Sequence, residues 1–108
     1  MTGRAAAGIM PGMSRPTLPS ELRGLRIHLV GAKGTGMAAF AEILSSRGAV
    51  LSGSDVAEAF FTDEILARIG LACRVFAADN VRPEHELVIH SSAYRRDTHP
   101  ELVEADRL

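Results

Sequence analysis

The stretch LRIHLVGAKGTGMAAFAEILSSRG, residues 25–48, decides the fold of this chain. Its first part, Leu25 to Val30, is a short apolar run bounded by glycines, which is typical of a central parallel strand covered on both faces. The part from Met37 to Leu44 places apolar residues at the i, i+3, i+4, i+7 spacing of one helix face. A strand and a helix are therefore predicted, with the glycine-rich turn Gly31 to Gly36 between them.

Further strands and helices are predicted to alternate along the rest of the chain. Strands are expected at 49–54, 72–76 and 87–90, and helices at 63–69 and from about residue 99 onward. Thr62 is expected to cap the second helix, and either His99 or a capping box of Thr98 and Glu101 the last one. This alternation predicts an α/β fold, a Rossmann-like three-layer domain with a parallel sheet and helices on both faces.

Length and composition limit the possible functions. The 108 residues fit one small domain, and the net charge of -1 gives no electrostatic reason to expect a nucleic-acid partner. We find neither an export signal nor a membrane-spanning stretch. The single cysteine, Cys73, is expected to be a buried and inert thiol, and a reduced, cytoplasmic location is expected.

Residues 1–22 differ in composition from the rest. They contain three of the five prolines and show no apolar periodicity, so we expect a flexible leader there. The folded domain is predicted to occupy residues 23–108.

The carboxyl ends of the predicted strands carry the candidate binding residues. Parallel sheets bind ligands at this edge, and a turn leading into a helix presents unpaired backbone N–H groups that suit a phosphate. The alternative is a purely structural role, in which the glycines only permit a tight turn, although three glycines in six residues exceed what a turn needs. The predicted substrate-binding residues are Gly31, Lys33, Gly34, Thr35, Gly36, Met37, Ser54, Asp55, Ser91, Ser92 and Ala93.

Two of these residues have alternative interpretations. Lys33 stands where the second glycine of a GxGxxG turn belongs, and its ammonium group either reaches a phosphate or is solvated on the loop. Asp55 lies where an acidic residue accepts hydrogen bonds from a ribose, and its alternative role is to cap a turn. His28 and His90 are expected to be hydrogen-bonded core residues, and no metal site, catalytic group or GxxxxGK[ST] loop for ATP is predicted.

Four segments together resemble a known family. HLVGAKGTGMAAFAEILSSRG, LSGSD, VIHSSAY and HPELVEA are similar, in order and spacing, to segments of the N-terminal domain of the Mur ligases. The resemblance covers residues 25–108 and is closest to the branch that adds L-alanine. The branch that recycles a muramyl tripeptide shares this domain and is the alternative.

The resemblance implies a substrate and a larger parent protein. It implies that the domain binds the UDP part of UDP-N-acetylmuramate, with Gly34, Thr35 and Gly36 at the diphosphate and the serines and Asp55 near the uridine and sugar. It also implies central and C-terminal domains that use ATP and Mg to form an acyl phosphate, so this chain alone is expected to bind without ligating. Ala77 and Ala78 depart from the Gly-His pair that the family often has, so that uridine-side contact is not carried over.

Two other functions remain open at this point. An NAD(P)-binding dehydrogenase fragment is suggested by the strand, turn and helix followed by Asp55, although Lys33 would crowd a pyrophosphate there. A stand-alone nucleotide sensor without enzymatic activity is the third possibility.

Overall fold

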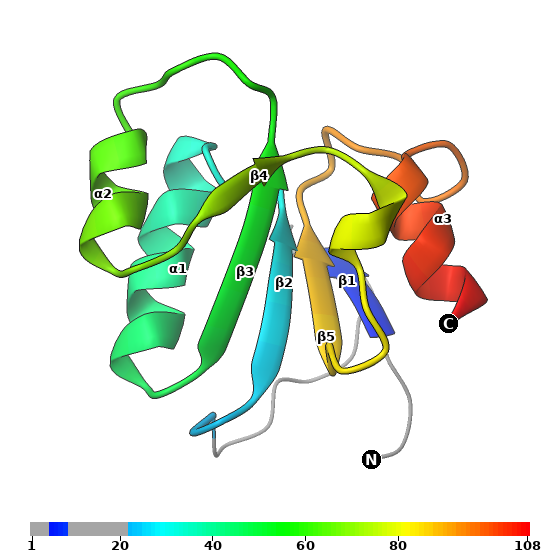
Figure 1. Ribbon diagram of the computed structural model, residues 1–108, viewed down its shortest axis with the longest axis horizontal. Helices are drawn as coiled ribbons and strands as arrows, with labels where there is room; N and C mark the ends of the chain where they lie inside the picture. Colours follow the sequence, from blue (N-terminus) through cyan, green and yellow to red (C-terminus); the bar gives the residue numbers. More distant parts are fainter. Residues whose placement is uncertain (1–4, 9–21) are drawn as a thin grey trace.

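Five parallel strands form one sheet in the order β1-β5-β2-β3-β4, and helices lie on both of its faces (Figure 1). This computed structural model describes residues 5–8 and 22–108. The strands are β1 (Ala5–Gly8), β2 (Arg26–Val30), β3 (Val50–Asp55), β4 (Cys73–Val75) and β5 (Leu87–His90). The helices are α1 (Thr35–Ser46), α2 (Asp63–Arg68), the short 3-10 helix η1 (Ala78–Asn80) and α3 (Pro100–Arg107). The predicted α/β class with a parallel sheet is confirmed.

Side chains that alternate along β2 build a separate core on each face of the sheet. Ile27 and Leu29 are fully buried in the core that includes α1 residues such as Ala41. Val30 belongs to the other core, together with Leu102 of α3. Both faces are thus covered by apolar helix surfaces, which explains why every residue of β2 after Arg26 is buried. None of the helices in the described ranges is long and apolar enough to cross a bilayer.

The register of the strands brings three strand ends to one edge of the sheet. Val30 at the end of β2 pairs with Ser54 of β3 on one side and with His90 of β5 on the other. The segments that follow these residues therefore leave the sheet side by side, as the sequence predicts.

Part of the predicted leader is a strand. Ala5–Gly8 forms β1, which pairs in parallel with β5 at the edge of the sheet. The prediction of a leader without structure was wrong for these four residues, because an edge strand can be held by backbone pairing and needs no apolar periodicity. Residues 1–4 and 9–21, the rest of that leader except Leu22, lie outside the described residues.

Of the two predicted helix caps, the one at α3 forms and the one at α2 does not. His99 occupies the N-cap of α3 and its Nδ1 accepts a hydrogen bond of 3.1 Å from the Glu101 N–H, so His99 rather than Thr98 caps this helix. Thr62 lies at the N-cap of α2 but makes no capping bond; its hydroxyl donates instead to the Lys33 carbonyl at 2.6 Å. The predicted role of Thr62 was therefore wrong, because a tertiary acceptor replaces the local one.

Cys73 and the two strand histidines, His28 and His90, differ in how deeply they are buried. Cys73 is half-buried rather than buried, and desolvation, followed by the nearby Asp55, raises the pKa of its thiol to about 11. Such a thiol carries little thiolate at neutral pH, as an inert cysteine should. His28 and His90 are both buried and hydrogen-bonded, which confirms the prediction for them.

Glu101 is a buried carboxylate that joins α3 to the sheet. Its side chain is fully buried, and it accepts four hydrogen bonds of 2.6–3.0 Å. Burial would raise the pKa of Glu101, but the hydrogen bonds from His28, Ser54, Asn80 and the Ala77 N–H outweigh it, so the pKa lies below its usual value. The charged form is therefore the one that the fold stabilises.

We expect the free energy of unfolding to fall as the pH is lowered through the folded-state pKa of Glu101. Because that pKa is lower in the folded chain, its contribution is complete above the ordinary value of 4.5 and is lost in more acidic solution. Glu101→Gln, which removes the ionisable group, should cost about 3 kcal/mol at pH 7. Urea titrations of both proteins should show this difference narrowing toward acid pH, and a difference independent of pH would contradict the assignment.

Candidate functional site

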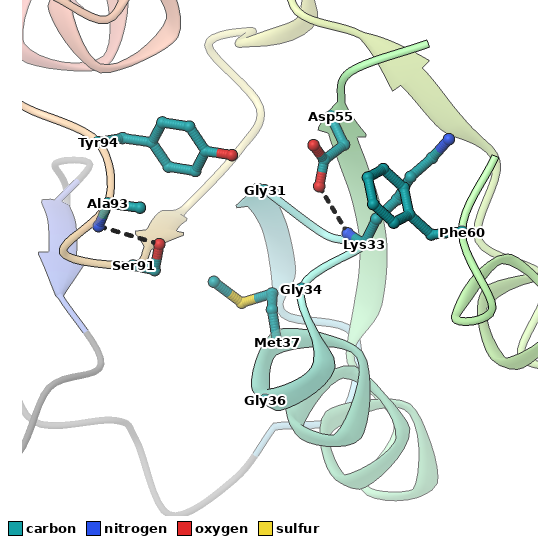
Figure 2. A pocket seen from close by; sticks show the side chains of 10 residues that line it. All are labelled: Gly31, Lys33, Gly34, Gly36, Met37, Asp55, Phe60, Ser91, Ala93 and Tyr94. Atoms are coloured by element: carbon teal, nitrogen blue, oxygen red, sulfur yellow. Dashed lines mark hydrogen bonds between the residues drawn. The ribbon is translucent and has the colours of Figure 1, made fainter. Parts of the chain in front are cut away.

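A cavity of about 350 Å³ lies at the carboxyl ends of β2, β3 and β5 (Figure 2). Its walls come from the glycine turn and the start of α1, from the end of β3 and the loop after it, and from the segment after β5. The residues that line it are Gly31, Lys33, Gly34, Gly36, Met37, Asp55, Phe60, Ser91, Ala93 and Tyr94. Every predicted site residue lines this cavity except Thr35, Ser54 and Ser92.

The glycine turn is held by the last two residues of β3. The Ser54 carbonyl accepts hydrogen bonds from the Gly31 and Ala32 N–H groups at 2.8 and 3.0 Å. The next amide, that of Lys33, donates to Asp55 Oδ2 at 2.8 Å. Three consecutive N–H groups of the turn are therefore used inside the protein and are not available to a ligand.

The first turn of α1 supplies the free donors instead. The Gly34 N–H donates to the Gly31 carbonyl, and the Ala38 N–H donates to the Gly34 carbonyl. Within the described part of the chain, the amides of Thr35 to Met37 have no hydrogen-bond acceptor. These N–H groups, together with the positive end of the helix dipole and the lack of acidic residues in this turn, favour an anion.

The three glycines of the turn have different reasons to be glycine. Gly31 has φ +84°, and a Cβ there would lie 2.6 Å from Tyr94 Cε2, so the fold itself requires glycine. A Cβ on Gly34 would make only ordinary contacts, the nearest at 3.4 Å, and one on Gly36 would meet nothing within 4 Å. At these two positions the chain leaves its backbone bare toward the cavity although its own packing does not demand it.

Lys33 does not direct its ammonium group into the cavity. The side chain is only 10% exposed, and Nζ donates to the Glu58 carbonyl and lies 3.5 Å from Asp63 Oδ1. Nζ also lies 5.8 Å from the centre of the Phe60 ring, and Figure 2 shows the side chain running behind Phe60, away from Tyr94. Lys33 therefore ties the turn to the loop before α2 and is not solvated on the loop surface.

The carboxylate of Asp55 is bound to the backbone around it. Its Oδ2 accepts the Lys33 N–H, and its Oδ1 accepts the Val56 N–H at 2.7 Å. The side chain is 6% exposed, although it still contributes to the wall of the cavity. The turn-capping alternative is thus the contact that the structure contains.

The three predicted serines are placed differently. The Ser54 hydroxyl is fully buried and donates to Glu101 at 2.6 Å, so Ser54, which was predicted to contact the ligand, does not line the cavity. Ser91 lines the cavity, and its Oγ accepts the Ala93 N–H at 3.3 Å, which leaves the hydroxyl proton free to be donated. Ser92 and Thr35 are exposed beside the cavity without lining it.

Two aromatic residues of the site were missed. Tyr94 packs edge-on against Phe76 and His99, with its hydroxyl directed over the turn (Figure 2). Burial, and then the charge of Asp55, raises the pKa of Tyr94, so its hydroxyl remains a donor at neutral pH. Phe60 is 46% exposed at the rim. Both residues lie in loops, and a single aromatic residue in a loop gives no sequence pattern by which it could have been found.

The arrangement is suited to binding an anion. The one carboxylate in the described lining, Asp55, already receives two backbone N–H groups. Among the described residues, no group of three or more His, Cys, Asp or Glu side chains is placed to hold a metal ion. The donors that remain are backbone amides and hydroxyl groups, which bind oxygen atoms of a phosphate or sugar.

We expect Gly31→Ala to destabilise the protein by about 2 kcal/mol, because it adds a left-handed alanine and a clash with Tyr94. Gly36→Ala, which meets open space in a helix, should change the free energy of unfolding by less than about 1 kcal/mol. Urea unfolding of the two variants measures both values. Equal losses for the two would show that the Gly31 contact with Tyr94 is not what restricts this position.

Comparisons with known proteins place the chain in a family. Residues 26–108 match the family described as "Mur ligase family, catalytic domain". The UDP-N-acetylmuramate--L-alanine ligase of Treponema pallidum (strain Nichols) is 51% identical over 96 residues, covering 88% of this chain and 20% of that protein. The proteins of the same name from Desulfitobacterium hafniense (strain Y51) and Mycobacterium sp. (strain JLS) are 44% identical over 85 residues and 42% over 99 residues. They cover 78% and 88% of this chain, and 18% and 20% of their own lengths.

The chain spans about a fifth of the length of these relatives. The family match nevertheless includes the glycine turn, the start of α1, the end of β3 and the segment after β5, which line the cavity. On this match and these identities, the chain belongs to the Mur ligase family.

Proposed function

We propose that this chain is the substrate-binding domain of a peptidoglycan ligase and that it binds the UDP part of UDP-N-acetylmuramate. The observation that carries this proposal is the set of free amides from Thr35 to Met37 at the start of α1, where Gly34, Gly36 and Met37 line the cavity and the two glycines leave the backbone bare. Family membership and the names of the relatives support the choice of nucleotide.

The proposed binding mode assigns the diphosphate to the start of α1. The free amides donate to its oxygens, and the helix dipole stabilises its charge by roughly 0.3–2 kcal/mol. Ser91 and Tyr94 on the opposite wall can donate their hydroxyl protons to the diphosphate or the sugar. The exposed ring of Phe60 offers an apolar face at the rim, and Asp55 keeps the turn in place beneath the ligand.

The role of the whole parent protein is also a proposal. In it, the ligase adds L-alanine to the muramate carboxylate in the cytoplasm, and ATP and Mg supply the energy and charge neutralisation for forming an acyl phosphate. The residues of this chain do not fit an ATP phosphate site, because Lys33 pairs with Asp63 rather than pointing into the cavity. This chain would bind and orient the nucleotide while other domains carry the reaction.

The alternative of an NAD(P) site is disfavoured by one contact. In a dinucleotide fold the acidic residue after the second strand accepts hydrogen bonds from the ribose. Here both oxygens of Asp55 already accept backbone N–H groups. The branch that recycles a muramyl tripeptide uses the same nucleotide and is not separated from the alanine-adding branch by this cavity.

Isothermal titration of the 108-residue chain tests the proposal. We expect saturable heat with UDP-N-acetylmuramate, weaker binding of UDP, and none with NAD. Gly36→Val should weaken binding of the sugar nucleotide at least tenfold, because its side chain would project toward the bound diphosphate, while the urea midpoint changes little. Binding of NAD in preference to the sugar nucleotide, or an unchanged affinity of Gly36→Val, would overturn the proposed site.

A further inference from the structure

A polar cluster under the sheet reaches the glycine turn without entering the cavity. Its centre is the buried carboxylate of Glu101. Oε1 accepts from Ser54 Oγ at 2.6 Å and from His28 Nε2 at 2.8 Å, and Oε2 accepts from the Ala77 N–H at 3.0 Å and from Asn80 Nδ2 at 2.8 Å. Glu101 thus contacts β2, β3 and η1 at once.

Ser54 connects this cluster to the turn. Its hydroxyl donates to Glu101, while its carbonyl accepts the N–H groups of Gly31 and Ala32. The residue that receives two amides of the turn is therefore itself held by the buried carboxylate. Two hydrogen bonds in succession separate Glu101 from the backbone of the turn.

With both imidazoles neutral, the rest of the cluster has one self-consistent set of proton positions. The Arg82 N–H donates to His85 Nδ1, so a neutral His85 has its proton on Nε2 and donates to Ser52 Oγ at 3.1 Å. The Ser52 hydroxyl then donates to His28 Nδ1 at 2.7 Å, which leaves the His28 Nε2–H for Glu101. These hydrogen bonds all run toward the carboxylate. The amide NH2 of Gln in place of Glu101 would face two donors, either His28 and Ser54 or the Ala77 N–H and Asn80.

We infer that Glu101 is a positioning residue for the nucleotide site: acting through Ser54, it sets the position of the glycine turn and so the affinity for the diphosphate, although it does not touch the ligand. This inference rests on the proposed function for its affinity readout, but not for its effect on the turn. A purely structural role, that of holding α3 to the sheet, would change stability without changing the turn.

The two carboxylate oxygens of Glu101 allow these roles to be separated. Ser54→Ala removes the link from Oε1 to the turn and keeps the backbone carbonyl that holds it. Asn80→Ala is the matched control, because it removes a hydrogen bond of 2.8 Å to Oε2, on the side that faces η1, together with the Asn80 bond to the Val75 carbonyl. Glu101→Gln perturbs both sides.

The experiment measures three quantities for the wild type and each variant: the urea midpoint, the amide proton and nitrogen shifts of Gly31 and Ala32 in the free protein, and the Kd for UDP-N-acetylmuramate by isothermal titration. We expect Ser54→Ala and Glu101→Gln to move both amide signals and to raise Kd about tenfold. Asn80→Ala should lower the urea midpoint but leave the amide signals and Kd close to those of the wild type.

The outcomes are distinguishable. Unmoved amide signals in Ser54→Ala, or an equal rise in Kd for Asn80→Ala at equal loss of stability, would overturn the positioning role. If Glu101→Gln fails to fold, Ser54→Ala and Asn80→Ala decide the question by themselves. If the wild type does not bind the sugar nucleotide, the proposed function fails, while the shifts of Gly31 and Ala32 still decide whether Glu101 positions the turn.

Discussion

The hydrogen bonds from the end of β3 to the glycine turn are the constraint on which the site depends. The Ser54 carbonyl and the Asp55 carboxylate together receive the amides of Gly31, Ala32 and Lys33. Because these three amides are bonded to β3, the position at which α1 begins is fixed. The unpaired amides of its first turn then lie beside the cavity. Donors that are already oriented lose little freedom when an anion binds, and this is the advantage of a preorganised site.

The same arrangement explains why a lysine is tolerated within the turn. Only its backbone N–H faces Asp55, and its side chain leaves along Phe60 to reach Glu58 and Asp63. The turn therefore has two kinds of tether, one through the backbone to β3 and one through a side chain to the loop before α2. Neither tether uses the amides from Thr35 to Met37, which remain for the ligand.

The fold could be predicted from the sequence further than the site could. Residues 25–48 predict a strand, a turn and a helix because their apolar residues follow the spacing typical of each element. The strand β1 has no such spacing and depends on its pairing with β5. Ser52 and Ser54 alternate along β3 on a buried face, a pattern that indicates a polar partner beneath the sheet. That partner, Glu101, lies 47 residues after Ser54, and a single sequence does not give such a pairing.

For the same reason the sequence could not say which way Asp55 and Lys33 point. Both were correctly expected at the edge of the cavity, but their contacts depend on loops that meet only in the folded chain. Tyr94 and Phe60 were missed because one aromatic residue in a loop gives no pattern.

The contact between Tyr94 and the turn has a consequence for ligand binding. The Tyr94 ring fills the space that a side chain on Gly31 would occupy, so the segment after β5 already touches the turn at one end of the cavity. A ligand does not have to draw these two walls together, and the entropy of ordering them is lost when the chain folds rather than when the nucleotide arrives. The separation of the two walls is therefore set by the fold before any ligand enters.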